Sequence, residues 1–237
     1  TNEHKATLDL RSGETAELRT RLEGVRQRYL MLEDLQKRHE GVSGGVLGII
    51  EQFADGEHPL SNAVEGMVAD LVTADVDTAP MIDAALGERS QYLVARSAEL
   101  ADAITRGDIP VEGRVGIIRS DLLPEPPKEN RIRLEGLQGV IGRADRVINC
   151  EPDQVKLISH LLSSTWLVED LDTAKRLQKF GGPGQRIVTR NGDVLESDGT
   201  MIVGPAATAT GLVRRRSELN AAAEEIENYT FQISEND

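Results

Sequence analysis

Two stretches near the ends of the chain carry apolar residues at the spacing of a coiled-coil seam. The first lies within the first 40 residues, which contain no proline, and its apolar positions are Leu18, Leu22, Val25, Tyr29 and Leu32. The second lies near the other end, at Leu219, Ala222, Ile226, Tyr229 and Ile233. Alternating steps of three and four residues predict two amphipathic helices, each with one narrow apolar stripe.

Both stripes need partners, because neither can stay exposed on an isolated helix. The helices can pack on a globular core, or they can pack on each other. In the second arrangement, which we favour, the chain leaves along one helix, folds and returns along the other. The result is an antiparallel hairpin with a globular part at its tip.

Between these helices an α/β pattern occurs twice. Each copy has an apolar helix, a short apolar strand, a second helix and a further strand that contains arginine. The strand, helix and strand cover residues 90–95, 97–106 and 113–118 in the first copy, and 164–169, 172–179 and 185–189 in the second. A repeated supersecondary unit predicts two related subdomains. The proline-rich stretch 123–130 between them predicts a linker.

The segment from Gly181 to Gly204 contains six glycines and a proline. Glycine is favoured where φ is positive or where another group comes close to the backbone. Asn191-Gly192, between two strand-like runs, predicts a two-residue hairpin with a type I′ turn, which needs positive φ at both positions. Residues 200–204 predict another short strand. The group that approaches these glycines could be a phosphate, a substrate or another protein chain.

Composition narrows the choice of partner. The chain has 237 residues and a formal net charge of −13, which argues against nucleic-acid binding over its whole surface but leaves room for a local basic patch. Cys150 is the single cysteine, so no intrachain disulfide can form, which fits a reducing compartment. No apolar run approaches the ~20 residues of a membrane span.

The motifs of common catalytic sites are absent from the sequence. The Gly-rich stretches lack the spacing of phosphate-binding loops, and the four histidines are scattered without metal-ligand spacing. Asp193, Glu196 and Asp198 cluster, but alternating acids beside a hairpin are typical of a solvated face. Trp166 is expected to fill the core of the second subdomain. We therefore expect no catalytic residue, no metal site and no cofactor in this chain.

The order of these pieces resembles the hinge domain of the structural maintenance of chromosomes (SMC) family. The segments that carry the resemblance are 84–87 with 92–95, 113–124, 165–174, 186–204 and 212–219. The resemblance implies a mixed α/β (α+β) globule of two related subdomains flanked by antiparallel coiled-coil arms. The implied boundaries are 1–40 and 210–237 for the arms, 41–125 for the first hinge subdomain and 126–209 for the second.

In that family the hinge joins two protomers at the tip of their coiled coils. The resemblance therefore implies a dimer, most simply a bacterial homodimer, in which each first subdomain meets the second subdomain of the partner. The implied interface residues are Asn191, Gly192, Gly199, Met201 and Gly204. Asp198 and Val203 stand where the family usually has glycine, which puts the tightness of one contact in doubt.

The resemblance also implies weak, sequence-independent contact with DNA. The candidate residues surround the return to the coil and are Arg186, Arg190, Arg214, Arg215 and Arg216. The alternative is a solvated junction in which these arginines pair with acids such as Glu218. ATP-binding ATPase heads and kleisin-type subunits would belong to parts of a longer protein outside this chain, located in the cytoplasm on the nucleoid, where it would serve chromosome condensation and segregation.

Two other classes of function remain open at this stage. One is a scaffold whose coiled-coil tip docks a different protein. The other is a small α/β enzyme or nucleotide-binding domain with helical additions.

Overall fold

The computed structural model describes residues 2–125, 133–180, 182, 184–204 and 211–236, with side chains from Gly13 onward. The chain divides into two compact units. One consists of Thr1–Glu40 with Arg215–Asp237, and the other is Gly41–Arg214. Two of the predicted boundaries, after residue 125 and after residue 209, lie outside the described residues, as does most of the predicted linker.

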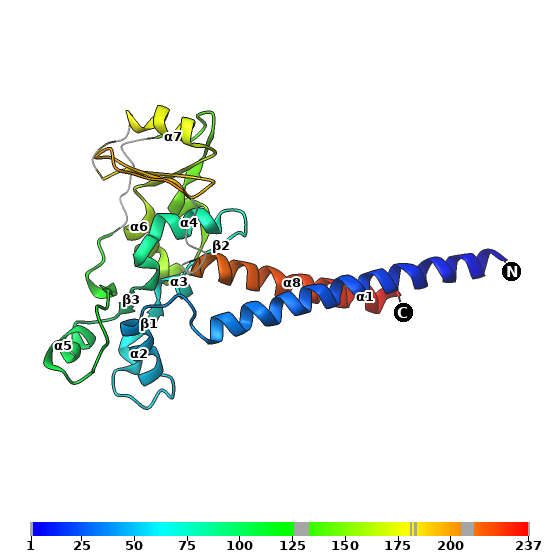
Figure 1. Ribbon diagram of the computed structural model, residues 1–237, viewed down its shortest axis with the longest axis horizontal. Helices are drawn as coiled ribbons and strands as arrows, with labels where there is room; N and C mark the ends of the chain where they lie inside the picture. Colours follow the sequence, from blue (N-terminus) through cyan, green and yellow to red (C-terminus); the bar gives the residue numbers. More distant parts are fainter. Residues whose placement is uncertain (1, 126–132, 181, 183, 205–210, 237) are drawn as a thin grey trace. The chain divides into compact units, whose positions relative to one another are not determined.

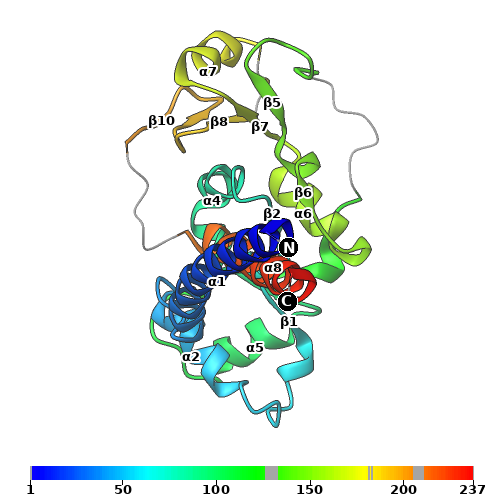
Figure 2. The same ribbon diagram turned by 90° about the vertical axis from the view of Figure 1, so that its right-hand side faces the viewer.

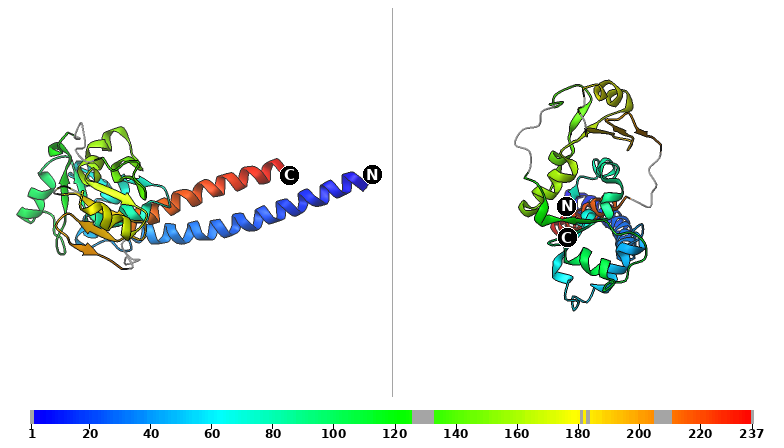
Figure 3. Two further views of the ribbon diagram at one scale, coloured as in Figure 1. Left: turned by 90° about the horizontal axis from the view of Figure 1, so that it is seen from above. Right: turned by 90° about the vertical axis from the view of Figure 1, so that its left-hand side faces the viewer.

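The first unit is a pair of long helices. It contains α1 (Asn2–Lys37) and most of α8 (Leu212–Asn236). The two helices run antiparallel, with both chain termini at the same end of the pair (Figure 3). Arg28 of α1 forms an ion pair of 3.2 Å with Glu218 of α8. Leu22, Leu32 and Ala222 of the predicted stripes are buried, which confirms the antiparallel coiled coil.

The second unit begins with a three-stranded sheet and its helices (Figure 1). In chain order these elements are α2 (Gly44–Gln52), β1 (Val64–Met67), α3 (Val68–Leu71), β2 (Thr73–Ala74), α4 (Ala79–Leu86), η2 (Gly87–Gln91), β3 (Leu93–Ala95), α5 (Glu99–Arg106), β4 (Ile117–Arg119) and η3 (Ser120–Leu122). The strand order is β1-β3-β4, in which β1 is antiparallel and β4 parallel to β3.

A five-stranded sheet follows in the same unit. Its elements are β5 (Val140–Arg143), β6 (Ile148–Asn149), α6 (Val155–Leu162), β7 (Thr165–Val168), α7 (Leu171–Gln178), β8 (Arg186–Thr189), β9 (Val194–Glu196) and β10 (Met201–Ile202). The strand order is β10-β9-β8-β7-β5. β6 is not part of this sheet, because it pairs with β2 of the first copy.

The structure confirms the predicted repeat and shows that each copy starts one strand earlier. β1 pairs antiparallel with β3 as β5 pairs with β7, and each pair contains a register shift just before a glycine, Gly66 or Gly142. A crossover helix then leads to a parallel strand in both copies, β3-α5-β4 and β7-α7-β8. The pairing of β2 with β6 joins the copies, and among the described residues the hairpin β9–β10 has no counterpart in the first sheet.

Two apolar clusters form the core of the second unit. The larger one includes residues from both copies, such as Leu93 and Leu167. The smaller one surrounds Trp166, which is fully buried between the five-stranded sheet and α7 and donates from its indole N–H to Gln185 at 2.9 Å. Figure 2 shows α7 on one face of this sheet and α4 on the side of the other face. The position predicted for Trp166 is therefore confirmed.

The hairpin between β8 and β9 differs from the predicted one. Thr189 and Asp193 pair through their backbone at 2.9 Å, so the loop has three residues, 190–192, instead of two. Gly192 has a φ of +86°, but among the described non-glycine residues only His39 has a positive φ, so Asn191 does not adopt the type I′ conformation. A three-residue loop with glycine in the left-handed position is the next most common hairpin. Mutual side-chain bonds between Thr189 and Asp193 close it.

Gly116 provides a test of how the first sheet is packed. It precedes β4 directly and accepts a backbone bond from Leu93 at 2.9 Å. A Cβ atom at this position would overlap the ring of Tyr92. We expect Gly116→Ala to lower the free energy of unfolding by about 1–3 kcal/mol, because the ring would have to move out of a packed site.

Urea unfolding followed by circular dichroism measures this effect. Gly48→Ala in α2 is the matched control, since its Cβ would meet nothing within 4 Å and alanine favours a helix by up to ~1 kcal/mol. Equal unfolding midpoints for Gly116→Ala and the wild type would show that Tyr92 does not hold this glycine.

Candidate dimer interface

The outermost strand of the five-stranded sheet presents an open apolar edge. β10 pairs with β9 on one side, Met201 opposite Leu195 and Ile202 opposite Val194. Within the described part of the chain no strand pairs with its other side. Met201, Ile202 and the following Val203 are 42%, 59% and 58% exposed. An edge with free backbone groups and three consecutive apolar side chains is typical of a strand that pairs with another chain.

A compact turn holds β10 against β9. The carboxylate of Asp198 accepts a bond from the backbone N–H of Thr200 at 2.8 Å, and the N–H of Gly199 donates to the carbonyl of Glu196 at 3.2 Å. Gly199 and Gly204 have φ values of +94° and +118°, and a Cβ at either position would meet nothing within 4 Å. These glycines therefore set the direction of the chain at both ends of β10 and leave the space beside it open.

The first sheet also ends in an open edge. β4 is the last strand in the order β1-β3-β4 and pairs with β3 alone among the described residues. Leu122, in the turn η3 after β4, is 66% exposed. This edge was not among the residues predicted from the sequence. The sequence feature that could have identified this edge is the apolar Leu122 beside the charged Asp121, shortly after an apolar strand.

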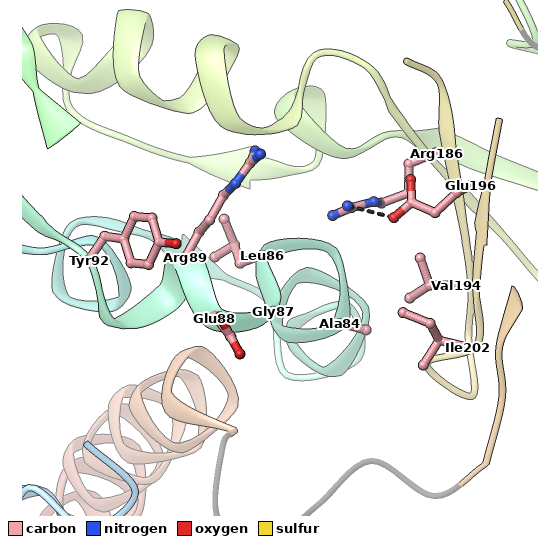
Figure 4. A pocket seen from close by; sticks show the side chains of 10 residues that line it. All are labelled: Ala84, Leu86, Gly87, Glu88, Arg89, Tyr92, Arg186, Val194, Glu196 and Ile202. Atoms are coloured by element: carbon pink, nitrogen blue, oxygen red, sulfur yellow. Dashed lines mark ion pairs between the residues drawn. The ribbon is translucent and has the colours of Figure 1, made fainter. Parts of the chain in front are cut away.

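The apolar side chains at the β10 edge of the five-stranded sheet alternate between its two faces. Side chains alternate between faces along a strand and match across paired strands. Leu195, opposite Met201, is 1% exposed and belongs to the cluster under α7. Val194, opposite Ile202, belongs to the cluster that includes α4. Ile202 therefore points to the α4 side, where it lines a pocket of about 260 Å³ (Figure 4).

Arg186 and Arg190, which were predicted to contact DNA, each form an ion pair with an acidic residue of this chain. Arg186 pairs with Glu196 of β9 at 2.6 Å and donates to the carbonyl of Ala85 in α4 at 2.5 Å. Arg190 binds both carboxylate oxygens of Glu169 at 2.8 and 2.9 Å. This bidentate hydrogen bond lowers the pKa of Glu169 and raises that of Arg190.

The other three predicted DNA contacts lie in the first two turns of α8. The backbone N–H groups of Val213 and Arg214 donate to the carboxylate of Asp83 at 3.0 and 2.8 Å, so a side chain of α4 caps this helix. The guanidinium of Arg215 donates to the carbonyl of Glu40 at 2.8 Å. Arg214 is exposed, and Arg216 is half-buried.

Other kinds of site were sought in the part of the chain that the structure describes. No three residues among its histidines, cysteines and carboxylates are placed to share a metal ion. None of its helices combines the length and the apolar character that a membrane crossing requires.

Comparison with known proteins points to one family. The family model described as "SMC proteins Flexible Hinge Domain" matches residues 61–178. The chain is 48% identical over 233 residues to the chromosome partition protein Smc of Rhodopirellula baltica, covering 98% of this chain and 19% of that protein. It is 30% identical over 221 residues to the protein of the same name from Myxococcus xanthus, covering 90% and 18%. The chain thus spans about a fifth of the length of these curated relatives.

Solved structures share the fold. One shows an asymmetric dimer of the Geobacillus stearothermophilus SMC hinge domain, with a TM-score of 0.79 and 23% identity, covering 99% of this chain and 94% of that one. Another is the Pyrococcus furiosus SMC hinge domain, with a TM-score of 0.51 and 19% identity, covering 76% and 88%. The family model ends at the end of α7, so the edge strand β10 lies beyond the matched segment.

The turn before β10 should depend on pH. The backbone N–H of Thr200 lowers the pKa of Asp198 in the folded chain. The resulting stabilisation is present above the ordinary aspartate pKa of about 3.9 and is lost as the pH falls through the lower folded value. Asp198→Asn keeps an oxygen acceptor for Thr200 but cannot ionise. We expect the free energy of unfolding to fall less steeply for this variant than for the wild type between about pH 5 and pH 2.

Urea unfolding at a series of pH values, at one protein concentration, measures the two slopes. Parallel curves for the two proteins would mean that Asp198 titrates alike in the folded and unfolded chains.

Proposed function

We propose, from the premise that this chain belongs to the SMC hinge-domain family, that it joins two copies of a chromosome partition protein by dimerisation at its open sheet edges. The observation that carries the proposal is the presence of two suitable edges on one unit, β10 with its exposed apolar residues at one edge of the second sheet and β4, followed by the exposed Leu122, at one edge of the first. The Geobacillus hinge of the same fold, seen as an asymmetric dimer, supports assembly in pairs.

The two edges suit each other because they belong to different sheets. If β10 of one copy pairs with β4 of the other, a two-fold arrangement makes the contact twice and closes. Each contact satisfies backbone groups that an edge strand leaves to water. Burial of a Met, Ile or Val side chain adds about 1.5–3 kcal/mol when it is complete. Two contacts of this kind offset the free-energy cost of association at least in part.

The other functions left open by the sequence receive less support. A nucleotide site would need a phosphate cradle, and the acids Asp193, Glu196 and Asp198 surround the glycine segment instead. A scaffold for a different protein would use the same open edge, so solution mass separates it from the dimer. A hinge has no catalytic task of its own, and the ATPase activity implied by the family would belong to other parts of the whole protein.

A charge at the edge tests the dimer. All three glycines predicted at the interface, Gly192, Gly199 and Gly204, have positive φ, so side chains there would strain the monomer as well as block a partner. Ile202→Lys avoids this strain because Ile202 lies in an ordinary strand and is largely exposed. We expect the wild type to sediment at twice the mass of the 25.9 kDa chain and Ile202→Lys to remain a folded monomer.

Leu137→Lys is the matched control, because Leu137 is 46% exposed and lies outside both edges. Sedimentation across a concentration series measures all three proteins. A wild type that stays at the mass of one chain at every concentration would overturn the proposed function. A dimeric Ile202→Lys would remove β10 from the interface.

We also propose that DNA touches the start of α8, with Arg214 as the main contact. Arg214 has an exposed side chain in the first turn of α8, and Arg215 and Arg216 follow it directly. If about two phosphates are neutralised, the expected slope of log affinity against log salt is about −2.

Fluorescence anisotropy with a labelled duplex at salt concentrations upward from ~20 mM measures this slope. Arg214→Glu should weaken the low-salt binding without changing the dimer mass. Arg106→Glu, on α5 of the first copy, serves as the control and should bind as the wild type does. Equal binding by Arg214→Glu and the wild type would exclude this junction as the DNA contact.

A further inference from the structure

The pocket beside β10 lies between the two copies of the repeat. Its walls come from α4 and η2 on one side and from β8, β9 and β10 on the other (Figure 4). Leu86, Val194 and Ile202 form apolar parts of the lining, and Arg89 and the Arg186–Glu196 ion pair form polar parts. The pocket thus adjoins the open edge of β10.

We propose that this pocket receives the side chain of Leu122 from a second copy of the chain. The proposal rests on the proposed dimer in which β10 of one copy pairs with β4 of the other. It adds a named anchor to that dimer. Each two-fold dimer would contain two such anchors, one at each pair of edges.

Leu122 is well suited to be an anchor. It is 66% exposed, whereas the next residue, Leu123, packs against the core. The turn that presents it is held at several points. Arg119 binds both carboxylate oxygens of Asp121 at 3.0 and 2.6 Å, and the hydroxyl of Ser120 donates to Glu65 at 2.7 Å. A large apolar side chain on a fixed turn loses little conformational freedom when it is buried by a partner.

The pocket lies within reach of that turn. A strand added to β10 lies about 4.8 Å from it. β10 has only two residues, so the end of β4 in the second copy lies within about 7 Å of Ile202 along the strand, whether the strands run parallel or antiparallel. Leu122 follows the end of β4 by three residues. Leu122 reaches the pocket when β4 of the second copy ends beside Ile202, and this register is part of the proposal.

Charged groups also surround the two surfaces. Asp121 sits next to Leu122, and the first sheet places Glu65 beside the same turn. Across the proposed contact stands Arg89, whose exposed side chain lines the pocket and forms no ion pair within the described residues. The apolar tip of the turn, beside an Asp121 that pairs with Arg119, thus faces a pocket of mixed polar and apolar lining with a cation at its rim.

Truncation of the anchor is the first test. We expect Leu122→Ala to raise the dimer dissociation constant at least tenfold, because two buried leucine side chains are lost per dimer. The stability of the monomer should stay the same, since Leu122 is exposed in one chain. Leu137→Ala is the control and should keep the wild-type constant. Sedimentation equilibrium of the whole 237-residue chain measures all three.

A cross-link supplies the second test, independent of affinity. Leu122→Cys combined with Ala84→Cys should give disulfide-linked dimers on mild oxidation, because Ala84 lines the pocket. Each single variant, which retains Cys150, should stay largely uncross-linked. The outcomes separate the two proposals. A monomeric wild type overturns the dimer and the anchor together. An intact dimer with unchanged affinity in Leu122→Ala and no cross-link overturns the anchor alone.

Discussion

Parallel pairing of neighbouring strands is the constraint from which the rest of this unit follows. A parallel pair cannot be closed by a tight turn, so the chain needs a crossover helix, α5 in the first copy and α7 in the second. The crossover leaves the last strand of each copy at an edge. In the first copy β4 stays there, whereas in the second the hairpin β9–β10 moves the edge outward by two strands. One topology, used twice with a different ending, thus gives two unlike edges.

The short helix α4 connects the five-stranded sheet with the start of α8 through hydrogen bonds that involve charged side chains. The carbonyl of Ala85 accepts a hydrogen bond from one terminal nitrogen of Arg186. The other terminal nitrogen forms an ion pair with Glu196 of β9, the strand next to β10. Two residues before Ala85, the carboxylate of Asp83 accepts hydrogen bonds from backbone N–H groups at the start of α8. A carboxylate at a helix N-terminus satisfies donors that the helix itself leaves open, and it is favoured by the helix dipole. The sheet that carries the edge strand β10 and the first turn of α8 are therefore held by the same eight-residue helix.

Periodicity alone predicted the parts of the fold in which local pattern and final environment agree. The stripes of the two long helices, the buried strands β3, β7 and β8 and the place of Trp166 are of this kind. Strands β1 and β5 were not predicted because each is four residues long and interrupted by a glycine at its register shift. Strands β2 and β6 were not predicted because each pairs with a strand of the other copy, far along the chain. The roles of Arg186 and Arg190 depended on acids that only the folded chain brings within reach.

The electrostatics of the glycine segment decide what kind of group can approach it. Asp193 bonds to Thr189 and to the N–H of Gly204, and Asp198 closes the turn before β10. Glu196 neutralises Arg186. Carboxylates in these positions repel a phosphate. A protein strand brings no net charge, and it offers the N–H and carbonyl groups that an edge strand lacks. The surroundings of Gly199 and Gly204 therefore suit a protein backbone better than a phosphate, and the residues between the two glycines include the exposed apolar Met201, Ile202 and Val203.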